Sequence, residues 1–262
     1  MKILIADKFE QFGVEQLQAL TPDVTCEPAL AGDELRRRVA EYQPTVLVVR
    51  STKVAADVLA ASPALKVVIR AGSGFDTIDV AAATQRGVSV ANCPGMNAVA
   101  VAELAMGLIL GLDRRIPDNV ADARACKWNK KGYSKARGLK GSTLGIIGAG
   151  RIGTEVAKRA LAFEMNVLYT HLGRNYVLAD RPHCRRVELD ELLRRADYVT
   201  VHVPGGGDTK ALIDERRLKM MKPTAFLINT SRASVIDEAA LIRALKEGWL
   251  AGAATDVYGN EP

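Results

Sequence analysis

The chain has 262 residues, of which 48% are hydrophobic, and it carries a formal net charge of +6. This length is enough for two domains, each with its own hydrophobic core. The longest apolar stretch, 98–112, contains Glu103 and is too short to span a bilayer, and charges within the first twelve residues exclude a signal peptide. We therefore expect no membrane partner.

The excess of positive charge does not by itself indicate a nucleic-acid partner. The arginines at 36–38 and 194–195 follow acidic residues in amphipathic helical patterns, which is typical of a solvated helix face. The four cysteines are scattered and form no C-x-x-C pair, which favours reduced thiols. We expect a cytoplasmic protein without a nucleic-acid partner and without a metal site.

The first part of the chain alternates short apolar runs with helical patterns. The apolar runs predict strands at 2–6, 45–49, 66–70 and 88–92, and the helical spacing predicts helices at 13–20, 33–42, 55–61 and 77–86. This alternation is typical of a parallel α/β sheet, whose ligands collect at the carboxyl ends of the strands. The loops of interest are therefore 50–53, 71–76 and 93–97.

A long and almost wholly apolar helix is predicted over 98–115. Because a helix that is apolar all round must be buried on most sides, we expect it both to run between two domains and to form a homodimer interface. The basic segment 127–140 that follows contains Trp128 and Tyr133, which indicate a segment anchored on another surface rather than a free linker.

The stretch T-L-G-I-I-G-A-G-R-I-G at 143–153 places glycines where a strand is followed by a helix. Gly148 permits a tight turn, Gly150 lets the backbone approach a pyrophosphate, and Gly153 lets the helix pack close to the strand. The helix start over 151–163 would favour an anion. Glycine-rich turns also occur for purely structural reasons, but the strand before and the helix after favour dinucleotide binding.

The second half of the chain continues the alternation. Strands are predicted at 166–170, 198–203, 225–229 and 252–257, and helices at 189–196, 214–221 and 237–247. Thr170 occupies the strand end where an acidic residue would bind the ribose of NAD, whereas His171 and Arg174 could meet the 2′-phosphate of NADP. The cofactor is therefore NAD or NADP.

At this point the chain resembles the D-isomer specific 2-hydroxyacid dehydrogenase family over nearly its whole length. The resemblance rests on R-S-T-K at 50–53, A-G-S-G-F-D at 71–76, N-C-P-G-M-N-A-V-A-V-A-E at 92–103, the glycine loop, H-V-P at 202–204, I-N-T-S-R at 228–232 and D-V-Y-G-N-E-P at 256–262. It is most similar to the D-3-phosphoglycerate dehydrogenase branch, with the glyoxylate and hydroxypyruvate reductases close.

The resemblance implies an α/β protein of two doubly wound parallel-sheet domains. A flavodoxin-like substrate-binding domain would span 1–96 and a Rossmann NAD(P)-binding domain 97–262. The implied activity is hydride transfer between nicotinamide and a small anionic D-2-hydroxy or 2-keto acid, of the 3-phosphoglycerate, hydroxypyruvate or glyoxylate class.

The resemblance also implies roles for individual residues. Arg232 would hold the substrate carboxylate and carbonyl oxygen, which suits a planar, permanently charged fork. The substrate-binding residues of the first domain would be Arg50, Ser73, Gly74 and Asn97. The cofactor-binding residues would be Gly148, Gly150, Arg151, Ile152, Gly153, Thr170, His171, Arg174, His202, Pro204, Thr230, Ser231 and Asp256. The alternatives are a surface arginine, ordinary turn chemistry and a structural histidine.

The family pairs a catalytic histidine with the glutamate that is Glu261 here, and that histidine would lie beyond Pro262. The last strand of the nucleotide domain and the helix that returns to the first domain would also lie there. We therefore expect a truncated form that binds cofactor with hardly any turnover, because loss of a positioned general acid costs about 10²–10⁴-fold in rate. Two alternatives stay open: a catalytically silent nucleotide-sensing or partner-binding protein on the same fold, and a damaged gene product. Ala233 and the segment 205–208 also depart from the family pattern.

Overall fold

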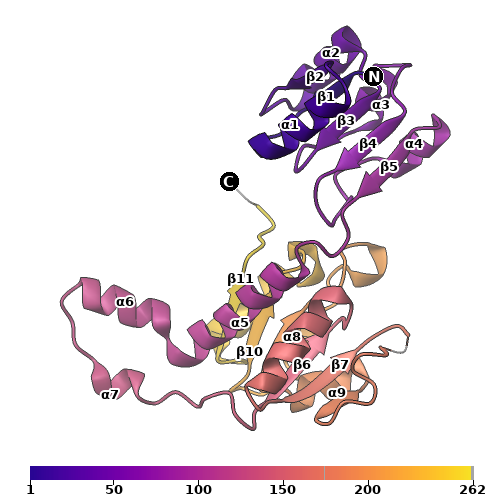
Figure 1. Ribbon diagram of the computed structural model, residues 1–262. Coiled ribbons are helices and arrows are strands. Elements are labelled where there is room, and N and C mark those ends of the chain that lie inside the picture. Colours follow the sequence, from indigo (N-terminus) through magenta and orange to yellow (C-terminus); the bar gives the residue numbers. More distant parts are fainter. Residues whose placement is uncertain (174, 261–262) are drawn as a thin grey trace. The chain divides into compact units, whose positions relative to one another are not determined.

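The computed structural model describes residues 1–173 and 175–260, so Arg174 and Glu261 lie outside the described residues. The chain divides into two compact units, Met1–Asn97 and Ala98–Pro262, which we call unit 1 and unit 2. Figure 1 shows their helices and strands. Among the described residues, no helix combines the length and apolar character that a membrane span requires.

Unit 1 contains a five-stranded parallel sheet in the order β2-β1-β3-β4-β5. This is the flavodoxin-like order, which confirms the predicted fold class of the unit. The strands are β1 (Ile3–Ile5), β2 (Val24–Cys26), β3 (Val46–Val49), β4 (Val67–Arg70) and β5 (Ser89–Asn92), and the helices are α1 (Gln11–Leu20), α2 (Gly32–Tyr42), α3 (Ala56–Ala60) and α4 (Val80–Gln85).

The strands of unit 1 bury residues on both faces because successive side chains point to opposite sides of a sheet. Leu4 packs with α2, α3 and α4 through residues such as Leu35 and Val58. Its neighbours Ile3 and Ile5 pack with Val14 of α1 on the other face. The continuous apolar strand runs of the sequence therefore correspond to a sheet covered on both sides.

Unit 2 contains a six-stranded parallel sheet in the order β11-β10-β9-β6-β7-β8. Counted from its own first strand, this is the Rossmann order 3-2-1-4-5-6 read from the opposite edge, which confirms the prediction. The strands are β6 (Thr143–Ile147), β7 (Asn166–Thr170), β8 (Cys184–Arg186), β9 (Tyr198–Val201), β10 (Phe226–Asn229) and β11 (Gly252–Thr255).

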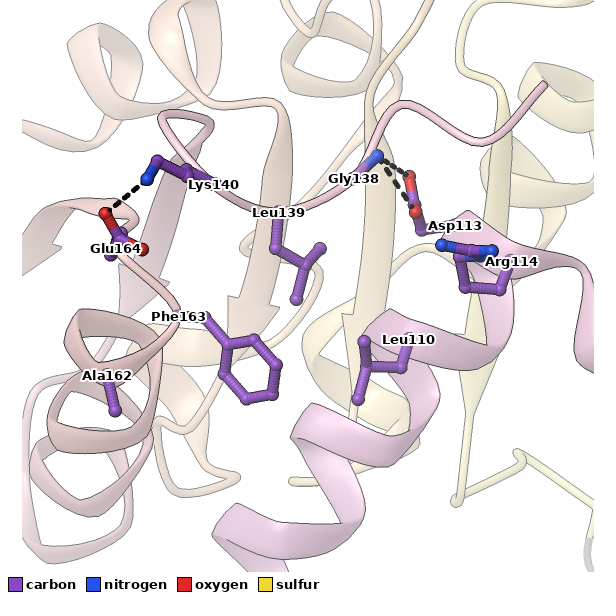
Figure 2. Close-up of a pocket in the computed structure, with 9 residues that line it drawn as sticks. All are labelled: Leu110, Asp113, Arg114, Gly138, Leu139, Lys140, Ala162, Phe163 and Glu164. Carbon is purple, nitrogen blue, oxygen red and sulfur yellow. Dashed lines mark hydrogen bonds and ion pairs between the residues drawn. The ribbon is translucent and has the colours of Figure 1, made fainter. Parts of the chain in front are cut away.

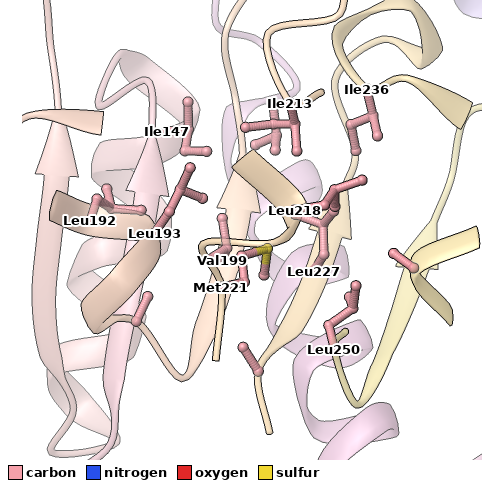
Figure 3. Packing of buried hydrophobic residues seen from close by; sticks show 14 of the residues in the cluster. Ile147, Leu192, Leu193, Val199, Ile213, Leu218, Met221, Leu227, Ile236 and Leu250 are labelled. Atoms are coloured by element: carbon pink, nitrogen blue, oxygen red, sulfur yellow. The ribbon is translucent and has the colours of Figure 1, made fainter. Parts of the chain in front are cut away.

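Helices cover both faces of this sheet. On one face, α9 (Leu189–Arg195), α10 (Glu215–Leu218) and α11 (Glu238–Glu247) enclose the cluster shown in Figure 3, with Leu192, Leu218 and Leu227 fully or almost fully buried. On the other face lie α5 (Ala98–Arg114) and α8 (Arg151–Ala162). The buried side chains of β6 therefore pack on both faces of the sheet, Ile147 with the first group of helices and Leu144 and Ile146 with the second.

Helix α5 begins at the predicted residue but is buried on one side only. Ala102, Met106 and Ile109 face the core of unit 2, whereas Val99 is 49% and Leu104 40% exposed. Past α5, residues 114–138 contain α6 (Ile116–Arg124) and α7 (Lys130–Tyr133) and include no buried residue. Trp128, which we expected to be anchored, is 84% exposed.

Two strands and two helices were not predicted. β2 and β8 are three-residue edge strands that lack an apolar run, and β8 reads Cys-Arg-Arg. α6 and α7 bury no residue and therefore have no apolar face for the sequence to reveal. All four elements lie at the periphery, so the predicted core is unaffected.

Candidate functional site

The carboxyl ends of five strands of unit 2 lie in one row. The row consists of Thr170, Ile147, Val201, Asn229 and Thr255, each paired with its neighbour in parallel register. The residues that follow them directly are His171, Gly148, His202, Thr230 and Asp256. All five were predicted to bind cofactor, and the sheet brings them to one edge, where parallel α/β sheets bind ligands.

The turn after β6 is fastened to the neighbouring strand β7. Gly148, with a φ of 95°, donates its N–H to the Thr170 hydroxyl at 3.1 Å, and Ala149 donates its N–H to the Thr170 carbonyl at 2.9 Å. Thr170 therefore holds the turn through both its side chain and its main chain. Beyond it, His171 is half-buried and the segment 172–173 is exposed.

The three glycines of the turn differ in the space that surrounds them. A Cβ on Gly148 would lie 2.8–2.9 Å from Val203 and from the backbone of His202, and a Cβ on Gly153 would lie 2.4 Å from the Gly148 carbonyl oxygen. A Cβ on Gly150 would meet no atom within 4 Å, and its φ of −75° suits any residue. Packing therefore requires glycine at 148 and 153, but it leaves the space next to Gly150 open.

Gly150 is also the N-cap of the twelve-residue helix α8, which continues with Arg151 and Ile152. The first N–H groups of a helix have no intrahelical partner, and the helix dipole places positive charge there. In the part of the chain that the structure describes, the N–H of Gly150 donates no hydrogen bond. The open space beside Gly150 thus adjoins backbone donors that suit a phosphate.

A buried amide, missed in the sequence, supports this turn from behind. Asn175 is 8% exposed, and its Nδ2 donates to the Ala149 carbonyl at 2.7 Å and to the Thr154 hydroxyl at 2.9 Å. Its Oδ1 accepts from the N–H groups of Val177 and Leu178 at 2.9 and 3.0 Å. An asparagine in a polar loop carries no periodic signal, so only the structure reveals these contacts.

The end of β9 carries a half-buried, uncharged histidine. The Nε2 of His202 lies 2.9 Å from the Thr200 hydroxyl, and its Nδ1 is buried without a partner among the described residues. Burial lowers the pKa of His202 to about 4. The imidazole is therefore neutral at pH 7 and is a poor proton donor. Pro204 is exposed, and its carbonyl accepts from the Thr209 hydroxyl at 2.7 Å.

The loop after β10 is shaped by Asn229, which the sequence analysis did not single out. Its Oδ1 accepts from the N–H and the hydroxyl of Ser231, both at 3.0 Å, and its Nδ2 donates to the Arg232 carbonyl at 3.0 Å. The Arg232 guanidinium donates back to the Ser231 carbonyl at 2.8 Å, and its stem lies over Gly205, where a Cβ would come within 3.0 Å. Gly205 thus makes room for Arg232.

Two further polar groups lie at the same edge. The Thr230 hydroxyl is buried and has no hydrogen-bond partner within the described chain. Asp256 donates its backbone N–H to the Asn229 carbonyl at 3.0 Å, which ties the end of β11 to that of β10. His202 and Thr230 therefore leave two buried polar atoms unsatisfied on adjacent strand ends, and such atoms are costly unless a ligand or water completes them.

Unit 1 brings its own predicted residues to the carboxyl edge of its sheet. The Ser73 hydroxyl donates to Asn97 Oδ1 at 2.6 Å, and the Asn92 amide donates to the Ser73 carbonyl at 2.7 Å. Asp7 accepts from the backbone N–H groups of residues 50–52, at 2.6 Å for Arg50. Burial works to raise the pKa of Asp7, but these hydrogen bonds outweigh it and hold the pKa below its ordinary value. The Arg50 side chain is left exposed.

A cavity of about 350 Å³ lies elsewhere in unit 2, away from these strand ends (Figure 2). It is lined by Leu110 and Asp113 of α5, by the end of α8 and by the 138–140 segment, where the Gly138 N–H donates to the Asp113 carboxylate. Buried Asp113 also accepts from the Tyr198 hydroxyl at 2.8 Å, and burial and this bond raise the pKa of Tyr198. The cavity contains no predicted site residue.

No three histidine, cysteine or acidic side chains converge on a metal-binding geometry within residues 1–173 and 175–260. The arginines considered for nucleic acid are engaged locally: Arg36 pairs with Asp33, and Arg38 with Glu27. The strand-end edge of unit 2 thus remains the candidate site, with backbone donors for an anion and Arg232 beside them.

Comparison with known proteins adds to this geometry. Residues 106–262 match the family model described as D-isomer specific 2-hydroxyacid dehydrogenase, NAD binding domain. A D-3-phosphoglycerate dehydrogenase of Archaeoglobus fulgidus is 40% identical over the whole chain, which covers 49% of that protein. A glyoxylate reductase of Pyrococcus horikoshii is 36% identical, with the chain covering 80% of it.

Solved structures agree. A D-lactate dehydrogenase of Aquifex aeolicus in complex with NAD and lactic acid is 30% identical, with a TM-score of 0.88 over 99% of this chain and 78% of that one. An acyclic imino acid reductase in complex with NADPH and D-Arg has a TM-score of 0.87 at 28% identity, over all of this chain and 84% of that one. The chain spans about half the length of the phosphoglycerate dehydrogenases that it matches.

Proposed function

Because this chain belongs to the D-isomer specific 2-hydroxyacid dehydrogenase family, we propose that it transfers a hydride between NAD or NADP and a small anionic D-2-hydroxy or 2-keto acid. The substrate would be of the 3-phosphoglycerate, hydroxypyruvate or glyoxylate class. Its relatives are named for these reactions, as D-3-phosphoglycerate dehydrogenase, glyoxylate reductase and hydroxypyruvate reductase.

One observation carries the cofactor proposal: no contact within the chain requires a glycine at position 150. Its φ of −75° does not require glycine and a side chain there would enter open space, whereas Gly148 and Gly153 are required by packing. A glycine that nothing in the fold requires, at the start of a helix, is explained by a ligand that approaches the backbone closely. The residues therefore fit a dinucleotide.

The chain's own residues would share the binding of cofactor and substrate. The turn 148–150 and the first turn of α8 would bind the diphosphate, with His171 and Arg174 near the ribose, and Thr230, Ser231, Asp256, His202 and Pro204 around the nicotinamide. When bound, the nicotinamide supplies or accepts the hydride. Arg232 would hold the substrate carboxylate and polarise its carbonyl through a fixed positive charge.

Residues of unit 1 would bind the rest of the substrate. Ser73 and Asn97 present polar side chains, the Gly74 N–H can donate to a carboxylate, and Arg50 offers a second positive charge. The carboxyl group of Glu261, outside the described residues, would raise the pKa of a nearby imidazole that exchanges the hydroxyl proton.

Hydride transfer is tested by following NADH absorbance with hydroxypyruvate, glyoxylate and 3-phosphohydroxypyruvate as acceptors. In a protein that also carries the family's catalytic histidine, Arg232→Ala should lower kcat/KM by at least about 100-fold, since it removes a charge that acts in the transition state. The control Arg243→Ala, which removes an exposed arginine of α11 paired with Glu215, should leave kcat/KM unchanged.

Because Thr170 replaces an acidic residue, NADPH should bind about as well as NADH, and a strong preference for NADH would contradict this assignment.

NADH binding without turnover on any of these acids would instead favour the alternative, a nucleotide-sensing protein on the same fold. Binding and turnover are therefore measured on the same preparation.

We also propose a homodimer through α5. The exposed side of this helix carries Val99, Leu104, Gly107 and Gly111, and a Cβ on either glycine would meet no atom within 4 Å. A second copy could approach this side closely. Gly107→Glu should leave the fold intact and convert a dimer into a monomer in sedimentation, whereas Ile242→Glu on exposed α11 should not. A monomeric parent protein would contradict the proposal.

A cytoplasmic location is part of the same proposal. All four cysteines are free, and Cys26 and Cys126 are exposed, as is usual for proteins in a reducing compartment. Fractionation of cells that express the tagged protein tests the location.

A further inference from the structure

We propose that Asn175 is a positioning residue of the dinucleotide site, which presets the Gly150 N–H toward the diphosphate by holding the Ala149 carbonyl from the opposite side. The inference rests on the proposed cofactor function. Asn175 lies 25 residues beyond Gly150 in the sequence, and its side chain is almost fully buried against the turn.

The planarity of the peptide bond links the Ala149 carbonyl to the Gly150 N–H. These two groups belong to one peptide group, which is trans, so they point in opposite directions. Asn175 Nδ2 holds this carbonyl at 2.7 Å from within the protein. The N–H must therefore point away from Asn175, and it makes no hydrogen bond within the described residues.

The Asn175 amide can adopt only one orientation. One end of the side chain faces the Ala149 carbonyl oxygen, which can only accept, and the other end faces two N–H groups, of Val177 and Leu178, which can only donate. The remaining Nδ2 hydrogen goes to Thr154 on the first turns of α8. The amide is thus satisfied at both ends and ties the turn, the helix and the 175–178 segment together.

Loss of this amide would have an energetic cost at the turn. Without it the Ala149 carbonyl would be buried without a partner, since Ala149 is 1% exposed, and the peptide group could rotate to reach one. Such a rotation would turn the Gly150 N–H away from an anion. Asn175 therefore lowers the free-energy cost of orienting the Ala149–Gly150 peptide group when a ligand binds. In this way a residue that touches no ligand can affect affinity.

The test compares ligands with and without a diphosphate. Asn175→Asp keeps the oxygen that accepts from Val177 and Leu178 but cannot donate to the Ala149 carbonyl. We expect the Kd of NADH, measured by fluorescence and calorimetry, to rise about tenfold, and the Kd of adenosine, measured by NMR, to stay within about twofold. Asn166→Asp is the matched control: it changes an exposed asparagine at the start of β7 that bonds the Gly141 carbonyl, and it should leave both constants unchanged.

A second variant covers the case in which Asn175→Asp does not fold. Thr154→Val removes only the second partner of Nδ2, and it should weaken NADH binding by about threefold, whereas Thr154→Ser should restore it. Equal losses for NADH and adenosine would show a merely structural role and overturn the inference, as would unchanged NADH affinity in both variants. A parent protein that binds no NADH would instead refute the proposed cofactor function.

Discussion

Each unit has a Gly-x-Gly turn after the carboxyl end of an interior strand, and the same hydrogen-bonding arrangement holds both turns. In unit 1 the turn is Gly72-Ser73-Gly74 after β4, and in unit 2 it is Gly148-Ala149-Gly150 after β6. In both, an asparagine amide donates to the carbonyl of the middle residue at 2.7 Å: Asn92 to Ser73 and Asn175 to Ala149. The following glycine N–H is directed away from the asparagine in each case.

The turns differ in the elements to which they lead. The turn of unit 2 leads directly into the twelve-residue helix α8, whereas the turn of unit 1 is followed by a second turn at 76–77 and only later by the six-residue helix α4. The middle residue is buried alanine in unit 2 but serine in unit 1, whose hydroxyl bonds Asn97. The same backbone device is therefore combined with a helix dipole in unit 2 and with polar side chains in unit 1, as expected if the proposed diphosphate and small acid bind there.

The largest expected effect is a loss of NADH affinity when the turn of unit 2, but not that of unit 1, is changed. Gly150→Val should fold normally, because its Cβ meets no atom within 4 Å, but it should weaken NADH binding by at least about 1,000-fold, or about 4 kcal/mol, by occupying the diphosphate position. Ser73→Ala in unit 1 should leave the NADH Kd unchanged in the same titration. Normal NADH affinity in Gly150→Val would mean that the open space beside this glycine is not the binding site.

Acid should affect the two units over different pH ranges. His202 has a folded pKa of about 4 against 6.5 for the ordinary side chain, so between these values the unfolded state binds more protons. Unit 2 should keep this contribution above pH 6.5 and lose about 3 kcal/mol of unfolding free energy as the pH falls to 4. The lowered pKa of Asp7 contributes to unit 1 above pH 3.8, and that contribution is lost only at lower pH.

Urea titrations at a series of pH values check this difference. Trp128 and Trp249 both lie in unit 2, so tryptophan fluorescence reports on that unit alone. His202→Asn should flatten the pH dependence of the fluorescence midpoint between pH 4 and 6.5, whereas Asp7→Asn, which changes unit 1, should leave that midpoint unchanged. A parent protein whose fluorescence midpoint is constant from pH 6.5 to 4 would show that His202 is not buried as described.

Within the turn of unit 2, stability should distinguish the glycines from one another. Gly148→Ala forces a Cβ to 2.8 Å from Val203 at a φ of 95° and should cost about 2 kcal/mol. Gly150→Ala should stay within about 0.5 kcal/mol, because it adds a methyl group to open space. Chemical denaturation measures both, and equal costs would remove the distinction between a packing glycine and a binding glycine.

The smallest expected effect tests whether the two asparagines are equivalent. Asn92→Asp should weaken binding of a D-2-hydroxy acid, measured by calorimetry, by about threefold to tenfold while leaving NADH affinity alone. Asn175→Asp should show the reverse pattern. If either variant weakened both ligands to the same degree, the two turns would not act independently and the comparison would fail.

Much of the fold could be predicted from the sequence because it is encoded locally. The buried strand runs, such as that before Gly148, and the helical spacing of the segments between them determine a parallel α/β protein. The glycine spacing at 148–153 predicted the type of turn and its ligand class, whereas His202, Thr230 and Asp256 were predicted from the resemblance to the dehydrogenase family. The strands, the helices and the glycine turn needed only short-range patterns.

Tertiary structure alone decided how the turns are held. Asn175 meets Ala149 across 26 residues and Asn92 meets Ser73 across 19, and no period of 2 or 3.6 indicates which asparagine in a loop is buried against which carbonyl. The same holds for the exposed side of α5, because an apolar composition does not say which neighbours are present. The sequence thus determined which backbone groups could bind a ligand, whereas their orientation depended on hydrogen bonds between distant segments that form only when the sheet is assembled.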